Sequence, residues 1–405
     1  MDNPRLNAIV PLSKQARRPT QPIVPIEQRE VAACMPLVQS LIASAAAVVV
    51  TYVTDLSHPW VLGLSAAQHG VPLVLVGHGR RWGGVAVKLP AARRAVQLLH
   101  AGSPDTPIVF ADGTDTFVTN PLTAELAGRL RAASSAGSVL VQAECNSWPR
   151  CYANEYAQHA AFSSCRARHS STCFPNSGAF AGRSETLLRF LAALERMAAA
   201  GEGPEHLDDQ AALHRLYLRS SDGIEVHVDE LSDVFLGLHA CKGSGAKRTF
   251  RVRGASFSMC HAGPYDPFSH VLPNGSRLSH RRSRHPNAPA ASEAAGDQRG
   301  RLHAPLLAHA HGVHDRILRA LWGAPGVYGR PLPPELRSPP SRSAQWRATY
   351  DSATLLDHQV LLIDSASAAD GGRADGDARG DLCRLTSLRE LCGGSNYTKV
   401  QGPFI

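Results

Sequence analysis

Residues 108–118 read IVFADGTDTFV, and this stretch decides the predicted fold. Its first three residues are apolar and are typical of the end of a buried strand. Gly113 then turns the chain and places Asp112 and Asp115 close together. Two neighbouring carboxylates at the open end of a buried strand repel each other unless a cation lies between them.

This pair of acids has two interpretations. Hard oxygen ligands with little protein around them suit Mn²⁺ or Mg²⁺, which keep coordination positions free for substrate phosphates. An Asp-Gly turn that closes a strand, with both acids in solvent, gives the same pattern. Because D-x-x-D is a short motif, its spacing alone does not decide between the two.

Apolar runs and helix-like runs alternate on both sides of this stretch. Residues 48–53 (VVVTYV), 71–76 (VPLVLV) and 138–143 (SVLVQA) have the near-continuous apolar character of strands that are covered on both faces. This rhythm predicts an α/β fold with a mostly parallel sheet and helices on both faces. Helices are predicted at residues 31–47, 57–69, 91–99, 122–133, 184–200 and 211–219, and a further strand at 224–228. Another short apolar run lies at 234–238.

Ligands of such sheets bind beyond the carboxyl ends of the strands, so residues 51–55, 77–84 and 112–115 are expected to face one crevice. Trp82 lies there between charged residues and a Gly pair. A flat indole in this position can stack on a base, and the nearby Lys88 can neutralise a phosphate. A Trp packed under the loop and a solvated Lys fit the local sequence equally well.

Polar residues also follow later strands. Glu144 and Trp148 come after one strand, and residues 173–182 (CFPNSGAFAG) contain small residues that permit close approach of the backbone to a ligand. Asp208 and Asp209 open a helix, where the helix dipole favours acids. Near a sugar site, the same carboxylates would bind hydroxyls or stabilise developing positive charge.

Residues 304–315 (APLLAHAHGVHD) combine a short apolar run with three His around Gly312. Imidazoles at this density after a strand are candidate metal ligands. A single His would more often be an ordinary core or surface residue.

The composition bounds the class of protein. The chain has 405 residues, 43% of them hydrophobic, which is enough for one large or two ordinary domains, and its formal net charge is +8. The basic run at residues 277–284 (RLSHRRSR) lacks aromatic interleaving, and no zinc-finger or helix-turn-helix pattern occurs, so a nucleic-acid binder rests on charge alone. The apolar run at residues 41–53 is too short to span a membrane convincingly.

Three regions are predicted. Residues 1–29 are a polar, Pro-rich arm, residues 30–330 are the folded domain with an insertion at 240–303, and residues 331–405 are a loosely attached Pro-rich and low-complexity tail.

Nine cysteines occur, and four lie in one short window at Cys145, Cys151, Cys165 and Cys173. Their spacing is not that of a structural zinc site, so local disulfides in an oxidising lumen are expected, with buried thiols as the alternative. The first residues lack the apolar core of a signal peptide, which disagrees with that expectation.

Seven segments, taken together, resemble the glycosyltransferase domain of the procollagen lysyl hydroxylases, enzymes that also glycosylate hydroxylysine with galactose and glucose. The resemblance covers about residues 48–312, with a gap across the insertion. It implies a GT-A fold, a Rossmann-like nucleotide-binding sheet that uses Mn²⁺ and a UDP-sugar. The segments are VVVTYVTD, RRWGG with a following Lys, VFADGTD, VQAECNSWP, FPNSGAFAG, HLDDQ and PLLAHAHG.

The resemblance implies that Asp112 and Asp115 ligate Mn²⁺ or Mg²⁺ together with a downstream His. His309 matches that His best, because an apolar run precedes it and Gly312 follows it. The rival is His261 in SMCHAGP, which lacks the preceding apolar strand.

The resemblance also assigns the remaining site residues. Those that would hold the nucleotide are Thr51, Thr54, Trp82, Lys88, Thr114 and Gly312, with Trp82 stacked on uracil. Those that would surround the transferred sugar and the acceptor are Glu144, Trp148, Asn176, Asp208 and Asp209. The chain departs from the family's pattern at Thr114, where the family has an aromatic residue, at His311, where it has Asn, and at the acidic run, which is one acid shorter.

The expected function is metal-dependent transfer of glucose or galactose from UDP-glucose or UDP-galactose to a hydroxyl, such as hydroxylysine or galactosylhydroxylysine in a collagen-like protein. The expected location is the lumen of the endoplasmic reticulum or Golgi, with no nucleic-acid partner and no integral membrane span. The alternative is a catalytically weak glycosyltransferase-like domain that serves as a binding or structural module.

Overall fold

A computed structural model of the chain describes residues 28–43, 45–54, 56, 60–80, 82, 84–134, 137–148, 152–167, 172–201, 206–219, 223–230, 232–238, 247–252, 255–260, 305–310, 357–363 and 383–391. The predicted N-terminal arm up to residue 27, most of the insertion, and the rival ligand His261 lie outside the described residues, as does Gly312.

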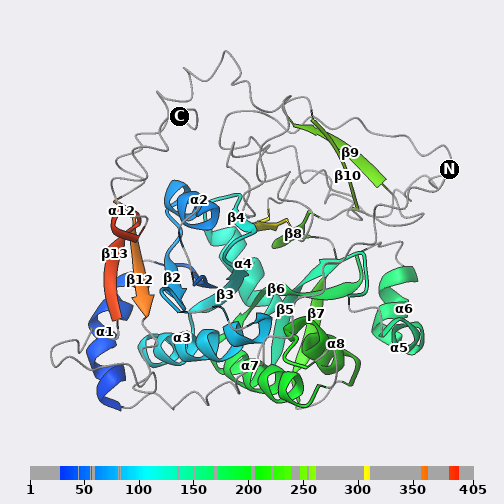
Figure 1. The fold of residues 1–405 in the computed structure, drawn as a ribbon, viewed down its shortest axis with the longest axis horizontal. Coiled ribbons are helices and arrows are strands. Elements are labelled where there is room, and N and C mark those ends of the chain that lie inside the picture. Colours follow the sequence, from blue (N-terminus) through cyan, green and yellow to red (C-terminus); the bar gives the residue numbers. More distant parts are fainter. Residues whose placement is uncertain are drawn as a thin grey trace.

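The core of the fold is an eight-stranded sheet with the order β13-β12-β2-β1-β3-β6-β5-β7 (Figure 1). Neighbours from β12 to β3 run parallel, as do β5 and β7, whereas β6 and β13 are antiparallel to their neighbours. The predicted α/β class with a mostly parallel sheet is therefore confirmed, and the sheet is compatible with a Rossmann-like fold. The strands are β1 (Val48–Tyr52), β2 (Leu73–Val76), β3 (Pro107–Asp112), β5 (Ser138–Glu144), β6 (Phe174–Arg183), β7 (Glu225–Asp229), β12 (Gln359–Ile363) and β13 (Cys383–Ser387).

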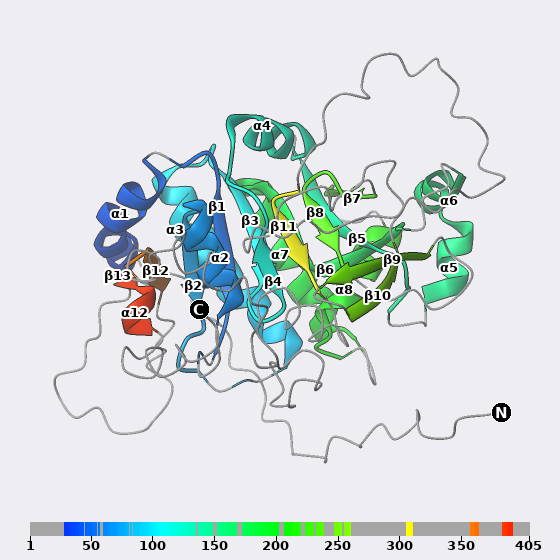
Figure 2. The same ribbon diagram turned by 90° about the horizontal axis from the view of Figure 1, so that it is seen from above.

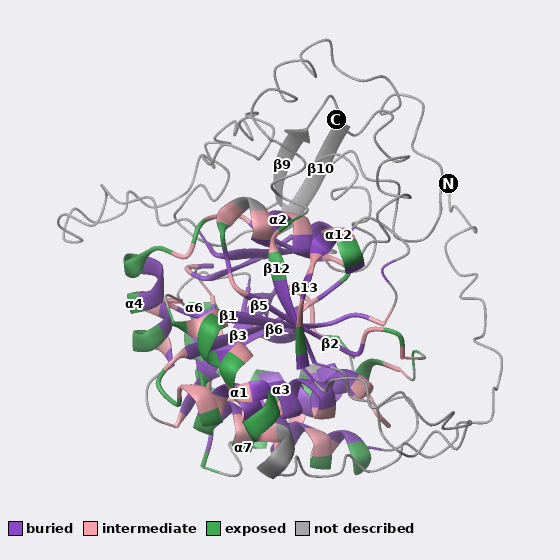
Figure 3. Cartoon of the chain, turned by 90° about the vertical axis from the view of Figure 1, so that its left-hand side faces the viewer, coloured by how far each residue is buried: buried purple, intermediate pink, exposed green. Residues whose placement is uncertain are grey.

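Helices cover both faces of this sheet, and its inner strands are buried (Figure 3). Alternate residues of β1 show why: Val48 and Val50 pack in one apolar cluster, and Val49 packs in the other. The first cluster includes side chains of α1 (Gln28–Ile42), α3 (Lys88–Gly102), α7 (Ser184–Ala199) and α8 (Asp209–Arg219). The second includes side chains of α2 (Val61–His69), α4 (Ala124–Ala133) and α12 (Leu388–Leu391).

A small sheet lies beside the carboxyl end of β3 and has the order β4-β11-β8 (Figure 2). Its strands are β4 (Thr116–Val118), β8 (Phe235–Gly237) and β11 (Leu307–His309). β11 pairs antiparallel with β4, which brings residues that are distant in sequence next to the turn after β3. The other described elements are the short helices η2 (Val85–Val87), α5 (Ala153–Gln158) and α6 (Ala160–Ala167), and the hairpin β9 (Lys247–Val252)–β10 (Ala255–Cys260).

The small-residue run at 173–182 forms the largely buried strand β6, where small residues permit close packing between β3 and β5. One expectation about the chain is wrong. The tail is not loosely attached throughout, since the apolar residues Val360–Ile363 pair with β2 as part of strand β12. A disulfide between Cys34 and Cys383 joins β13 to α1.

A second disulfide, Cys165–Cys173, is local, as expected, and Cys145 is also disulfide-bonded. This cysteine chemistry is compatible with an oxidising lumen. Among the described residues, no helix has both the length and the apolar character that a membrane crossing requires.

Candidate metal centre and the polar network beside it

The turn after β3 is held in place by its surroundings. A Cβ atom at Gly113 would lie 2.0 Å from Val53 Cγ2, so a larger residue does not fit at this position. Trp60 Nε1 donates a hydrogen bond to the Gly113 carbonyl at 3.0 Å. Together with the hydroxyl of Thr116, which donates to the Asp112 carbonyl, these contacts fix the backbone between the two acids.

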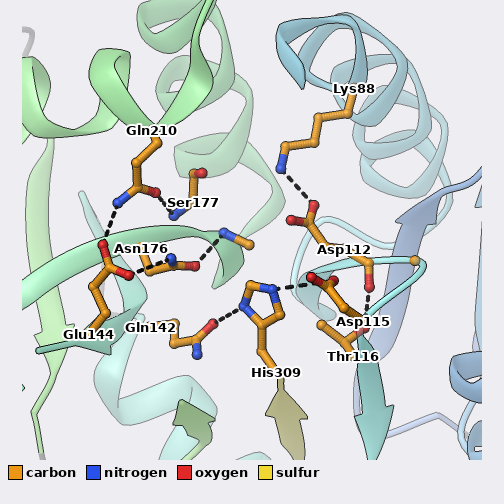
Figure 4. Close-up of polar contacts among 12 residues, drawn as sticks. Lys88, Asp112, Asp115, Thr116, Gln142, Glu144, Asn176, Ser177, Gln210 and His309 are labelled. Atoms are coloured by element: carbon orange, nitrogen blue, oxygen red, sulfur yellow. Dashed lines mark hydrogen bonds and ion pairs between the residues drawn. The ribbon is translucent and has the colours of Figure 1, made fainter. Parts of the chain in front are cut away.

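Asp112, Asp115 and His309 converge at this turn (Figure 4). Their candidate ligand atoms all lie within 4.8 Å of one another, and His309 Nε2 is 3.3 Å from Asp115 Oδ1. The pairing of β11 with β4 delivers the imidazole, and the backbone N–H of Ala310 donates to the Asp115 carbonyl at 2.8 Å. The described residues contain one further cluster of this kind, but two of its three members form the Cys165–Cys173 disulfide.

The donor set fits a divalent cation. Asp115 Oδ1 is buried and accepts no hydrogen bond within the described part of the chain, although the His309 ring lies beside it. Two carboxylates and an imidazole form a donor set that suits first-row divalent ions such as Mn²⁺. Burial and the neighbouring Asp115 carboxylate raise the pKa of Asp112, so the site disfavours adjacent negative charge until a cation neutralises it.

Lys88 already supplies part of that neutralisation. Its buried Nζ lies 2.6 Å from Asp112 Oδ1 and 2.8 Å from Asp209 Oδ2. Burial lowers the pKa of Lys88, but the carboxylates of Asp112 and Asp209 raise it by more, so the ammonium stays charged. Three carboxyl groups, from Asp112, Asp115 and Asp209, thus lie around one ammonium and one imidazole.

Beside the candidate metal centre, Glu144 is the centre of a buried polar network. Asn176 Nδ2 donates to Glu144 at 3.2 Å, and Gln210 Nε2 donates to it at 3.0 Å. The backbone N–H groups of Ser177 and Gly178 donate in turn to Gln210 Oε1 at 2.6 Å and Asn176 Oδ1 at 2.8 Å. The structure therefore brings the predicted Glu144 and Asn176 together and adds Gln210, which the sequence pattern marked only as the end of HLDDQ.

Trp148 lies at the margin of this network. Its backbone carbonyl is 2.6 Å from Nε2 of the buried His214, while its side chain is 63% exposed. Sequence reasoning missed His214 because a lone His in an amphipathic helix carries no signal of its own.

The candidate nucleotide residues do not all share one surface. The Trp82 side chain is 54% exposed and lies 6.0 Å from the Tyr52 ring, and Thr114 is exposed beside the metal centre. Thr54 is half-buried. Thr51 is fully buried beneath Gly113, so its expected contact with a base or ribose is not possible in this structure.

The two acids of HLDDQ have different roles. Asp208 Oδ1 accepts a hydrogen bond from the Ala211 N–H at 2.8 Å, which is the capping role that the alternative interpretation gave it. Asp209 is buried and forms the ion pair with Lys88.

Compared with known proteins, the chain matches no protein-family profile and no curated protein. The class of site is therefore defined by its own geometry: an Asp-Asp-His cluster of two half-buried acids and a buried imidazole at the carboxyl end of the central strand β3.

The first prediction concerns Glu144, because burial raises the pKa of its carboxyl to about 8, against the opposing effect of the Asn176 hydrogen bond. In the unfolded chain this group ionises near pH ~4.3. The folded state therefore binds more protons between these two values, and its stability falls as the pH rises through this window. Glu144→Gln removes the effect, so the variant should gain a few kcal/mol relative to wild type between pH 5 and pH 8.

Thermal unfolding of both proteins across this pH range measures the difference. Glu185→Gln, at an exposed position in α7, is the matched control and should follow the wild-type profile. Parallel profiles for wild type and Glu144→Gln would show that Glu144 is ionised in the folded protein at pH 5.

Proposed function

We propose that the chain is a glycosyltransferase of the GT-A type that moves glucose or galactose from a UDP-sugar to a hydroxyl. The observation that carries this proposal is the convergence of His309 with Asp112 and Asp115 at the carboxyl end of β3. A centre of two carboxylates and one imidazole at the carboxyl ends of the strands of a mostly parallel α/β sheet is suited to bind a divalent ion that holds the diphosphate of a nucleotide sugar.

Asp112, Asp115 and His309 would hold Mn²⁺ or Mg²⁺, and the bound ion would supply Lewis-acid neutralisation of the departing diphosphate. The exposed Trp82 offers an indole face to the base, and the exposed Thr114 lies on the turn between the two acids. Lys88 holds Asp112 and Asp209 in fixed positions through its two short ion pairs. These contacts support a donor site that is organised before the nucleotide binds.

The network around Glu144 supports an acceptor site next to the donor. The exposed Trp148 indole provides an apolar face of the kind that packs against a sugar ring. With its pKa near 8, Glu144 holds a proton at neutral pH, and Asn176 and Gln210 keep its carboxyl in place. The proposed acceptor is a hydroxyl of a collagen-like protein, hydroxylysine or its galactosyl form, in the lumen of the secretory pathway.

Two observations favour a second candidate, a binding module with little catalytic power. The Lys88 ammonium lies 2.6 Å from Asp112 Oδ1, where it competes with a metal ion for that oxygen. Thr114 also provides no aromatic ring beside the nucleotide. Such a module would bind a nucleotide sugar without turning it over.

Release of UDP from UDP-glucose and UDP-galactose, with Mn²⁺ present and after chelation with EDTA, separates the two candidates. The glycosyltransferase proposal predicts UDP release that needs Mn²⁺ and rises when an acceptor peptide with hydroxylysine is added. Binding of the nucleotide sugar without release would favour the binding module, and release that ignores chelation would contradict the metal-dependent mechanism.

The second prediction is that Trp82→Ala weakens UDP binding by about 1–3 kcal/mol, because an aromatic ring stacked on a base contributes about that much. Calorimetric titration of UDP in the presence of Mn²⁺ measures the change. Because Trp82 is an exposed residue, the variant should keep the melting temperature of wild type. Unchanged UDP affinity would remove Trp82 from the nucleotide site, while Trp148→Ala, at another exposed indole, should leave UDP affinity unaltered.

A further inference from the structure

The orientation of His309 is set by residues that do not themselves belong to the ligand set. The imidazole is buried, and its two nitrogens face opposite ways (Figure 4). Nε2 points to Asp115 at 3.3 Å, whereas Nδ1 lies 2.8 Å from Oε1 of Gln142. Gln142 is fully buried and comes from β5, a strand of the main sheet, whereas His309 comes from the small sheet.

Regular alternation along β5 directs Gln142 to the face of the sheet on which Leu140 and Leu307 pack, and the neighbouring strand β6 is irregular at this point. Along β5 and β6 the register shifts between Val141, which is opposite Phe180, and Gln142, which is opposite Asn176. β6 therefore carries additional residues at this step, which is the character of a β-bulge. A bulge bends the strand that carries it and often lies next to a functional site.

Gly178 lies within this bulge and forms the wall of the space that the ring occupies. A Cβ atom at residue 178 would lie 2.0 Å from His309 Cε1 and 2.6 Å from its Nδ1. The Gly178 N–H is fixed by Asn176 Oδ1 at 2.8 Å, so the backbone cannot move away without breaking that bond. The His309 ring is thus in close contact with the backbone of β6 on one side.

We propose that Gln142 and Gly178 are positioning residues that hold His309 as an Nε2 metal ligand. The side-chain carbonyl of Gln142 accepts the proton of Nδ1, which directs the remaining lone pair, on Nε2, to the space shared with Asp112 and Asp115. The close contact with the Gly178 backbone prevents the His309 ring from moving to other positions. This inference rests on the proposed metal-dependent function, and it concerns residues to which neither the D-x-x-D motif nor the downstream His run assigned a role.

The test compares variants that remove or keep the acceptor. Gln142→Leu removes the carbonyl with little change in volume, whereas Gln142→Glu keeps an acceptor oxygen in the same place. Loss of a partner that orients a ligating His typically weakens metal binding by about 10–100-fold. Titration of Mn²⁺ monitored by electron paramagnetic resonance should show that loss for Gln142→Leu, and the affinity of Gln142→Glu should stay within about threefold of wild type or increase.

Gly178→Ala should weaken Mn²⁺ binding as well, because the added methyl displaces the ring. Gly128→Ala is its matched control, since residue 128 is exposed in α4 and a Cβ there meets no atom within 4 Å. Thermal unfolding of each variant separates lost metal binding from lost folding. If Gln142→Leu fails to fold, NMR of the wild-type protein decides, because the proposal requires a slowly exchanging proton on Nδ1 of His309.

Wild-type affinity in Gln142→Leu, or a His309 ring without a proton on Nδ1, would overturn the inference. Absence of Mn²⁺ binding in wild type, or unchanged binding in His309→Ala, would overturn it together with the metal centre. If wild type binds Mn²⁺ and Gln142→Leu does not, while no UDP-sugar is turned over, the positioning role stands and only the glycosyltransferase proposal fails.

Discussion

Asp115→Asn is expected to remove Mn²⁺ binding and to lower metal-dependent UDP release about a thousandfold, because metal-ion stabilisation of a leaving group contributes several kcal/mol. Asp115 provides the carboxylate oxygen that is buried, lies beside His309 and has no hydrogen-bond donor among the described residues. The Asn amide oxygen is a neutral and weaker ligand than a carboxylate. Its two N–H groups are donors, which a cation repels. UDP release and Mn²⁺ titration measure the two parts of the expectation.

The variant should remain folded, since it removes one negative charge from a cluster in which Asp112 already has a raised pKa. A melting temperature at or above that of wild type is the expected control result. Asp105→Asn, at an exposed position before β3, is the matched variant and should keep full activity. Retention of metal-dependent turnover by Asp115→Asn would exclude Asp115 as a ligand.

The second large effect is expected from the disulfide between Cys34 and Cys383, which closes a loop with a sequence separation of 349. In the chain-entropy account, a cross-link of this length stabilises the folded state by about 6 kcal/mol, slightly above the usual range. Replacing both residues by Ala should lower the free energy of unfolding by about that amount. Denaturant unfolding under oxidising and reducing conditions measures the change.

This disulfide also holds an edge of the sheet. β13 pairs only with β12 within the described sheet, and β12 pairs with β2, so the bond to α1 secures the whole C-terminal strand pair. Hydrogen exchange of the β12 amides should therefore accelerate in the double variant, while that of the β3 amides should change less. The pair Cys165–Cys173, with a separation of 8, is the control, and its removal should cost about half as much. Equal effects of the two changes would contradict the entropic explanation.

Local sequence patterns were enough to predict several strands and the position of the two acids. The near-continuous apolar runs predicted β1, β2, β3 and β5 to within about two residues, because a strand buried on both faces must be apolar along its length. D-x-x-D directly after such a strand predicted where the two acids lie. The apolar residues before His309 indicated a strand, and pairing of that strand with β4 is what brings the imidazole to the acids.

Other features depend on contacts that local patterns do not encode. β12 has four consecutive apolar residues between Pro-rich and low-complexity sequence, and its place beside β2 follows from long-range pairing. Gln142 looked like one polar residue in an apolar strand until the bulge beside it and the buried His309 ring gave it a partner. Thr51 shows the opposite error: a polar residue near the end of a strand was expected in the crevice, but the tight turn at Gly113 covers it.

Crystals grown with Mn²⁺ and UDP, measured at a wavelength where manganese scatters anomalously, test the central claim most directly. We predict one strong anomalous peak bonded to carboxylate oxygens of Asp112 and Asp115 and to Nε2 of His309, with the UDP diphosphate completing the coordination. A manganese peak elsewhere in the protein, or bound UDP whose diphosphate lies away from this turn, would contradict the account.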